Sequence, residues 1–122
     1  MVARLKHLLP LVLLAGFSAA CHSEATVRRD YTPVEYLKNY ALASCLADGY
    51  QSADAVATAN GYKELGSLDI EAYNTAAVLG RQFLAREYPS QNGAELVLMK
   101  CVDLYHSKEL ATLARRYAKG RR

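Results

Sequence analysis

The sequence predicts an all-α protein, a small bundle of about five helices tied by one disulfide. Apolar residues recur at helical spacing along most of the chain, whereas the apolar–polar alternation that is typical of strands is hard to find. A content of 52% hydrophobic and 22% charged residues indicates a globular chain rather than a disordered one. Its 122 residues are enough for one domain.

The beginning of the chain has the composition of a signal peptide over residues 1–20. Arg4 and Lys6 precede an apolar run at residues 8–20, which is too short for a comfortable membrane span. We therefore expect export, most simply to a bacterial periplasm. Removal of residues 1–20 takes away Arg4 and Lys6 but no acid, which lowers the formal charge from +3 to +1. An exported, nearly neutral chain is not expected to bind nucleic acid.

Two cleavage positions fit this leader, and they differ in what happens to Cys21. A cut after Ala20 leaves Cys21 at the new N-terminus, the place of a lipoprotein cysteine, although Ser18 stands where a lipobox prefers an aliphatic residue. A cut after Ala25 removes Cys21 altogether. Attachment to a membrane is expected only if Cys21 is lipidated. Residues 21–30 are expected to form a flexible, polar lead-in.

The helical domain is expected over residues 31–119, and its first helix carries clear start signals. Thr32 suits the N-cap, Pro33 suits the first helical position, and Glu35 completes a capping box. Gly49 is expected to end this helix.

A short second helix is expected over residues 53–59, with Ser52 as its cap and Gly61 as its stop. The next stretch, residues 60–67, is predicted to be a loop because two glycines bracket large side chains. A loop that displays such side chains is more typical of recognition than of a mere connection. The alternative is that its Tyr and Leu fill gaps in the bundle. The displayed residues are Tyr62, Lys63, Glu64 and Leu65.

A long third helix is expected over residues 69–88, stopped by Pro89. Residues 88–93 (YPSQNG) are rich in turn formers and predict an irregular connection. The side chains expected to face the core from this helix are Ile70, Tyr73, Ala76, Ala77, Leu79, Gly80, Phe83 and Leu84.

The stretch 95–117 contains two amphipathic helical runs that cannot belong to one straight helix. The first has its apolar stripe at Leu98, Cys101, Val102 and Tyr105, and the second at Leu110, Leu113, Ala114 and Tyr117. At about 100° per residue these stripes point roughly 120° apart. We therefore expect a break near His106 and Ser107, with Ser107 as the N-cap of the last helix.

Cys45 and Cys101 both fall on predicted core-facing stripes. In an oxidising compartment two such cysteines predict a disulfide, and the alternative is two free buried thiols. The chain-entropy model assigns a stabilisation of roughly 4 kcal/mol to a bridge that closes a loop of this length.

The sequence offers no constellation of catalytic or metal-binding residues. Cys101 and His106 are five positions apart, about 140° around a helix, so they point in different directions. We find no Gly-rich phosphate loop and no Ser nucleophile motif. The sequence therefore predicts no enzyme, no cofactor and no metal site.

Five stretches of the chain carry a resemblance to a known family: 36–46 (YLKNYALASCL), 61–66 (GYKELG), 71–73 (EAY), 88–90 (YPS) and 98–110 (LMKCVDLYHSKEL). Through these stretches, residues 31–117 resemble the immunity proteins that protect bacteria from the fourth family of type VI secretion peptidoglycan amidases. The match is one of pattern over almost the whole mature domain and includes no chemical motif.

The resemblance implies a periplasmic, all-helical and non-enzymatic protein that forms a homodimer. It implies binding to a cognate amidase with a Cys–His catalytic pair, in a heterotetramer, and inhibition by a protruding loop that fills the amidase groove. The residues to which this role would fall are first Tyr62, Lys63, Glu64 and Leu65, and second Ser90, Gln91 and Asn92. The rival hypothesis is a periplasmic helical lipoprotein or scaffold protein with no inhibitory role.

Overall fold

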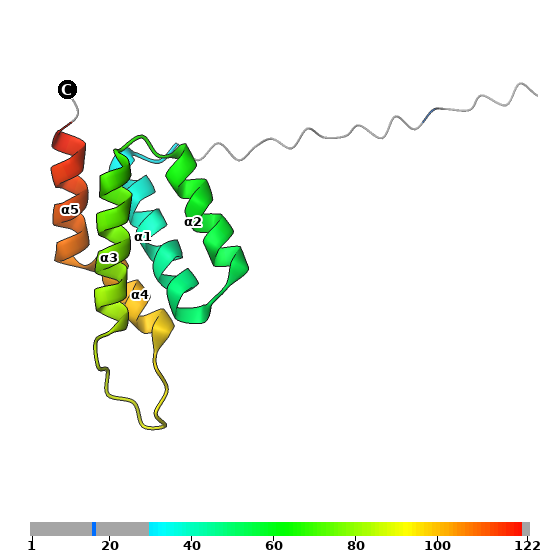
Figure 1. The fold of residues 1–122 in the computed structure, drawn as a ribbon, viewed down its shortest axis with the longest axis vertical. Helices are drawn as coiled ribbons and strands as arrows, with labels where there is room; N and C mark the ends of the chain where they lie inside the picture. Colours follow the sequence, from blue (N-terminus) through cyan, green and yellow to red (C-terminus); the bar gives the residue numbers. More distant parts are fainter. Residues whose placement is uncertain (1–15, 17–29, 121–122) are drawn as a thin grey trace, which may run out of the picture.

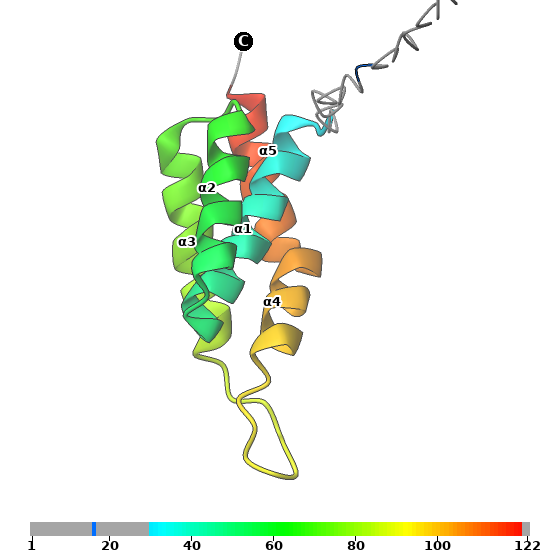
Figure 2. The ribbon, with the colours of Figure 1, turned by 90° about the vertical axis from the view of Figure 1, so that its right-hand side faces the viewer.

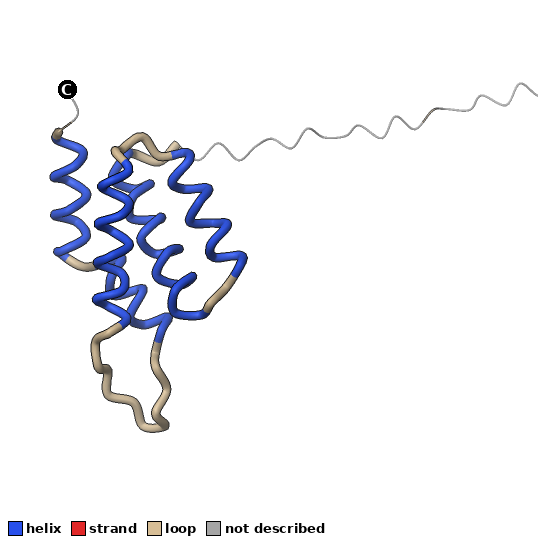
Figure 3. The backbone as a smooth tube through the Cα atoms, viewed as in Figure 1, coloured by secondary structure: helices blue, strands red, loops and turns tan. Residues whose placement is uncertain are grey.

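The computed structural model describes Gly16 and residues 30–120, which form five helices and, within these residues, no strand (Figures 1 and 3). The expected all-α bundle is thus confirmed. Apart from Gly16, the predicted signal peptide, its cleavage positions and Cys21 lie outside the described residues. No helix in the described part has the length and hydropathy needed to cross a membrane. The helices are α1 (Pro33–Tyr50), α2 (Ala53–Leu65), α3 (Ile70–Leu84), α4 (Val97–His106) and α5 (Lys108–Lys119).

Helix α1 starts as its sequence predicts, with a complete capping box. The Glu35 backbone N–H donates to the Thr32 hydroxyl at 3.2 Å, and the Thr32 N–H donates to the Glu35 carboxylate at 2.7 Å. On the outside of this cap, Tyr31 and Tyr36 meet edge to face with ring centroids 5.4 Å apart. Two local interactions therefore fix the point at which the chain enters the bundle.

The end of α1 differs from the prediction, because the helix continues through Gly49 to Tyr50 and Gln51 takes the left-handed conformation. Gly49 has a packing role instead. A Cβ at this position would overlap the side chain of Val97, the first residue of α4. The glycine lets α4 approach the backbone of α1 closely.

Helix α2 extends six residues further than predicted, so the expectation of a loop at Tyr62, Lys63, Glu64 and Leu65 is wrong. Gly61 costs a helix only about 1 kcal/mol relative to alanine. Burial of Ala59 and partial burial of Tyr62 outweigh that cost. The helix ends at Leu65, and the N–H of the capping residue Gly66 donates to the Tyr62 carbonyl at 2.9 Å. A Cβ on Gly66 would overlap the hydroxyl of Tyr73.

Helix α3 stops at Leu84, short of the predicted end at Tyr88. The N–H of Ala85 donates back to the Arg81 carbonyl and that of Arg86 to the Phe83 carbonyl, which tightens the last turn. Most of the predicted inner face is confirmed as buried or half-buried, but Ile70, at the first turn, is 60% exposed.

The predicted break between the last two helices is confirmed at Ser107. Its hydroxyl accepts from the Leu110 N–H at 3.1 Å and donates to the Leu104 carbonyl at 2.7 Å, so one side chain ends α4 and starts α5. The stripe predicted for α5 is confirmed, with Leu110, Leu113 and Ala114 buried.

The stripe predicted for α4 is correct only in part. Cys101 is fully buried, and Leu104 and Lys100 are buried beside it, whereas Leu98 is 54% and Val102 40% exposed. The disulfide and the contact of the first turn with Gly49 set the rotation of this helix, and the side chains on its other face point outward.

Helix α1 is the centre of the bundle and contacts all four other helices (Figure 2). Cys45 of α1 and Cys101 of α4 form the predicted disulfide, with an S–S distance of 2.07 Å, and both are buried. Gly80 lies beside this bridge: a Cβ at that position would be 3.6 Å from the Cβ of Cys45, an ordinary van der Waals contact. The disulfide therefore lies within the buried core of the bundle.

Candidate functional site

The most prominent feature outside the core is the connection between α3 and α4, residues 85–96, which we call the projecting loop. It extends beyond the end of the helices, away from the rest of the bundle (Figures 1 and 2). It contains Ser90, Gln91 and Asn92, the second set of residues that the sequence nominated. The loop is much longer than the typical connection of about 4–6 residues in compact domains.

The tip of the projecting loop is organised by its own hydrogen bonds. The Ala94 N–H donates to the Ser90 hydroxyl at 2.9 Å and to the Asn92 side-chain oxygen at 3.1 Å. The Ser90 hydroxyl donates to the same Asn92 oxygen at 3.0 Å. Gly93 has a φ of +72°, which other residues rarely adopt. Gln91 and Asn92 are exposed at this turn, so the tip presents side-chain amide groups on a backbone whose conformation is fixed by internal hydrogen bonds.

The base of the projecting loop is tied to α4 by two side chains that the sequence analysis did not nominate. Lys100, which is 8% exposed, donates from Nζ to the Leu84 carbonyl at 3.0 Å. The Tyr88 hydroxyl donates to the Asp103 carboxylate at 2.5 Å. This hydrogen bond is the main reason that the pKa of Tyr88 lies above its ordinary value. The only sequence signal for Lys100 was a cation inside an apolar helical run.

The other nominated set lies at the opposite end of the bundle, in the last turn of α2 (Figure 1). Tyr62 is half-buried in an aromatic cluster, 6.3 Å from the ring of Tyr31 and 6.5 Å from that of Tyr36. Glu64 is exposed, and Leu65 is 67% exposed. The structure thus separates the two sets, and only the second belongs to a loop that projects.

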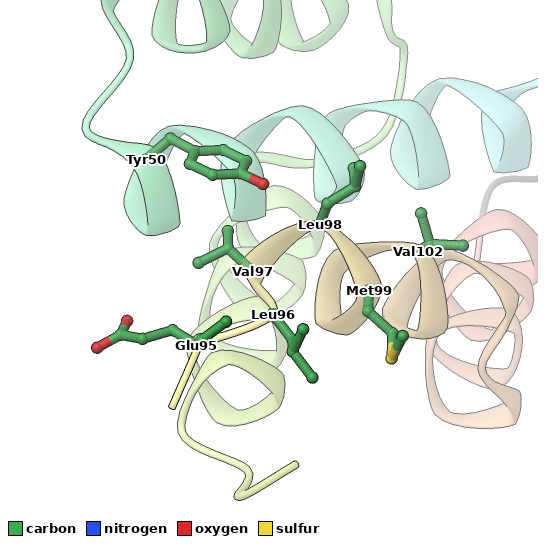
Figure 4. A pocket seen from close by; sticks show the side chains of 8 residues that line it. Tyr50, Glu95, Leu96, Val97, Leu98, Met99 and Val102 are labelled. Carbon is green, nitrogen blue, oxygen red and sulfur yellow. The ribbon is translucent and has the colours of Figure 1, made fainter. Parts of the chain in front are cut away.

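An exposed apolar face adjoins the base of the projecting loop. We call it the apolar face; it is formed by Tyr50, Leu96, Leu98, Met99 and Val102 (Figure 4). Four of these side chains are 40–55% exposed, and the carboxylate of Glu95 lies at the edge. This face was not predicted from the sequence. A signal was present, however, because the four consecutive apolar residues 96–99 cannot all point to one side of a helix.

The residues weighed for catalysis are not assembled into a reactive site. Cys45 and Cys101 are joined in the disulfide and have no free thiol. His106 is exposed and packs edge to face on Tyr105, with ring centroids 5.2 Å apart. Among the described residues, no three His, Cys, Asp or Glu side chains lie close enough together to hold a metal ion.

Comparisons with known proteins agree with this architecture. A solved structure of the effector–immunity system Tae4/Tai4 from Salmonella typhimurium is 34% identical, with a TM-score of 0.65, over 70% of this chain and 89% of that chain. A second, from work on type VI-secreted toxins and self-resistance proteins of Serratia marcescens, is 31% identical, with a TM-score of 0.64, over 72% of this chain and 76% of that chain. A comparison with curated proteins finds no match.

The family model for the amidase immunity protein of the type VI secretion system, Tai4, matches residues 35–114. This range runs from the first turn of α1 into α5 and includes both cysteines and the projecting loop. The match covers well over half of the chain and agrees with the two structural likenesses. The chain therefore belongs to the type VI secretion system amidase immunity protein family.

Proposed function

We propose that this protein binds a cognate type VI secretion peptidoglycan amidase and inhibits it by inserting the projecting loop, residues 85–96, into the active-site groove. Family membership supports the immunity role. The observation that carries the choice of element is that this loop extends from the bundle and has an internally hydrogen-bonded tip.

The chemistry of the tip suits a groove built to accept a peptide. Gln91 presents an amide donor and acceptor, as a peptide substrate does, and Asn92 presents its amide NH₂, because its oxygen accepts two hydrogen bonds within the tip. Neither side chain carries a charge that would have to be desolvated. The turn at Gly93 is already formed, so less conformational entropy is lost on binding than for a flexible loop. An occluding loop needs these two properties.

The Tyr62–Leu65 set takes second place in this proposal. Tyr62 is engaged with Tyr31 and Tyr36, which leaves Leu65 and Glu64 as the accessible side chains at that end of the bundle. Because the two sets lie at opposite ends, one narrow groove cannot accommodate both from the same copy. A contact through Glu64 or Leu65 would instead require a second surface of the amidase.

The remaining parts of the proposal concern location and chemistry. We infer that residues 1–20 direct export to the periplasm, where peptidoglycan amidases act and where the Cys45–Cys101 bridge can form. We also infer that the protein acts by binding rather than by catalysis. Both inferences are supported by the family match.

We further propose that the mature protein is a homodimer and that the apolar face is where the second copy docks. Homodimer interfaces are more apolar than the average protein surface. Tyr50, Leu98, Met99 and Val102 supply such a surface, with a single carboxylate at its edge. Pairing through this face would remove these side chains from water on both copies at once.

The test of inhibition is amidase activity on purified peptidoglycan, with the amidase encoded beside this gene and one molar equivalent of residues 24–122. We expect complete loss of activity and a stable complex on gel filtration. Asn92→Arg places a bulky charge at the tip and should restore most of the activity. Glu64→Arg makes a larger change in charge at the opposite end of the bundle and should still inhibit.

The opposite ranking of these two variants would move the site to α2. Full amidase activity with wild-type protein and no complex would instead support the rival function, a helical lipoprotein or scaffold.

A further inference from the structure

We infer that Lys100, Tyr88 and Asp103 are positioning residues for inhibition: they hold the base of the projecting loop so that its tip points away from the bundle. We call Leu84, Tyr88, Lys100 and Asp103 the loop base. The inference rests on the proposed function of the loop, and it assigns the loop base no direct contact with the amidase.

Lys100 makes the first of the two ties. Its side chain is almost fully buried, and its ammonium donates to the carbonyl of Leu84, the last residue of α3. A cation at a helix C-terminus meets the negative end of the helix dipole. Burying an ammonium is costly, and an apolar side chain would fill the space at less expense. The hydrogen bond from Lys100 to Leu84 joins the start of α4 to the end of α3, and it therefore holds the two ends of the projecting loop at a fixed separation.

The second tie starts inside the loop. Tyr88 lies four residues beyond the end of α3, and its hydroxyl reaches Asp103 on α4 at 2.5 Å. A hydrogen bond to a carboxylate is stronger than one between neutral groups. The Tyr88 ring also lies 5.8 Å from the Lys100 ammonium, within the range of a cation–π contact. Lys100 and Asp103 are three residues apart and therefore share a face of α4.

These ties matter because the hydrogen bonds described for the tip join it to itself. Ser90, Asn92 and Ala94 bond with one another, which shapes the turn but does not orient it relative to the helices. The direction of the tip is then set where the loop leaves α3 and passes Tyr88. Without the ties, a connection of this length would sample many directions, and binding would select only a few of them.

The experiment measures the order of the loop and the inhibition of the amidase on the same variants of residues 24–122. Backbone ¹⁵N relaxation reports the order of residues 89–95, and titration of the amidase reports the inhibition constant. Tyr88→Phe removes only the hydroxyl, and Asp103→Ala removes the acceptor. Asp103→Asn keeps an acceptor oxygen and is the conservative control. Lys100→Met tests the first tie, and unchanged core resonances confirm that each variant is folded.

We expect Tyr88→Phe and Asp103→Ala to lower the order parameters of the tip below about 0.6, the range of flexible backbone. The same two variants should raise the inhibition constant about tenfold. Asp103→Asn should behave like the wild type. Combining Tyr88→Phe with Asp103→Ala should add little to either single change, because both remove the same hydrogen bond.

Unchanged order parameters of the tip in both Tyr88→Phe and Asp103→Ala would overturn the inference, even if inhibition were weaker. A more flexible loop with an unchanged inhibition constant would overturn it too. Asn92→Arg separates this result from failure of the proposed function. If Asn92→Arg abolishes inhibition while Tyr88→Phe and Asp103→Ala leave the inhibition constant unchanged, only the inference falls. If Asn92→Arg also inhibits like the wild type, the loop is not the inhibitory element.

Discussion

Val97, at the start of α4, packs directly on Gly49 in the last turn of α1, where any Cβ would overlap the valine side chain. The contact lies at the same end of the bundle as the projecting loop and, with the Cys45–Cys101 bridge, sets the position of α4. Gly49, which the preference of glycine for helix C-termini assigns to the end of α1, therefore allows close contact between α1 and α4 instead.

Substitution of Gly49 by alanine should destabilise the protein even though alanine is the better helix former. The gain in helix propensity is about 1 kcal/mol, whereas an added methyl group that overlaps a packed neighbour costs typically 1–3 kcal/mol. Urea unfolding measures the net change. Gly61 is the matched control, since it lies in α2 with open space around a hypothetical Cβ. Gly61→Ala should stabilise the protein by up to about 1 kcal/mol.

The double variant Gly49→Ala/Val97→Ala tests the mechanism, because removing the valine branches makes room for the new methyl group. It should lose less stability than the two single changes together. Strict additivity would show that the cost at Gly49 does not come from Val97.

Loss of the disulfide should reduce the free energy of unfolding by about 2–5 kcal/mol. The bridge joins residues 56 positions apart and ties α4 to the central helix. Replacing both Cys45 and Cys101 with alanine removes the cross-link without leaving a free thiol. Unfolding with and without a reductant then gives the comparison. The wild type should lose stability on reduction and the double variant should not, and equal responses would argue against a stabilising bridge.

The capping box predicts a pH dependence that Glu35 contributes. The Thr32 backbone N–H, which donates to the carboxylate, is the main cause that holds the pKa of Glu35 below its ordinary value of 4.5. A lowered pKa in the folded state adds stability that is fully present above the unfolded pKa. That stability is lost as the pH falls through the folded pKa.

Glu35→Gln should therefore lower the urea midpoint at pH 7, and the difference from the wild type should shrink when the pH is taken below about 4.5. Glu87→Gln, a change of the same kind at an exposed loop residue, is the control and should show a smaller dependence. A Glu35 effect that is constant with pH would mean that the ionised carboxylate is not what stabilises the cap.

A charge in the apolar face should break the proposed homodimer. Leu98→Asp would bury an unpaired carboxylate in the interface, which should weaken association by roughly ten- to a hundredfold. Light scattering during gel filtration gives the mass of the particle. Val56→Asp, on an exposed part of α2, should leave that mass unchanged. If Leu98→Asp leaves the mass unchanged but prevents amidase binding, the face belongs to the effector.

The sequence predicted best those features that depend on a few neighbouring residues. The capping box at Thr32 and the N-cap at Ser107 are local hydrogen-bonding patterns, and both are present. The disulfide was also predictable, because two cysteines on core-facing stripes are expected to pair in a chain that its first residues predict to be exported. The fold class and the number of helices followed from the helical spacing of apolar residues, which is also a local pattern.

Helix ends and the candidate site depended on contacts between distant residues. Helix α2 passes through Gly61 because Tyr62 packs on the start of α1, and it stops where Tyr73 excludes a side chain. Helix α3 stops at the residue whose carbonyl Lys100 takes. Leu84 and Lys100 lie 16 residues apart, and Tyr36 and Tyr62 lie in different helices, so the local rules for helix ends contain neither contact.

By itself, then, the sequence determined the fold class, the N-caps at Thr32, Ser52 and Ser107, and which two cysteines can pair. Only the tertiary structure decided which connection projects and which apolar side chains of α4 remain in contact with water. The physical reason is that periodicity defines an apolar stripe on a helix but not its rotation against its neighbours. For α4 that rotation is fixed by Cys45, Gly49 and Leu84, all of them outside the helix itself.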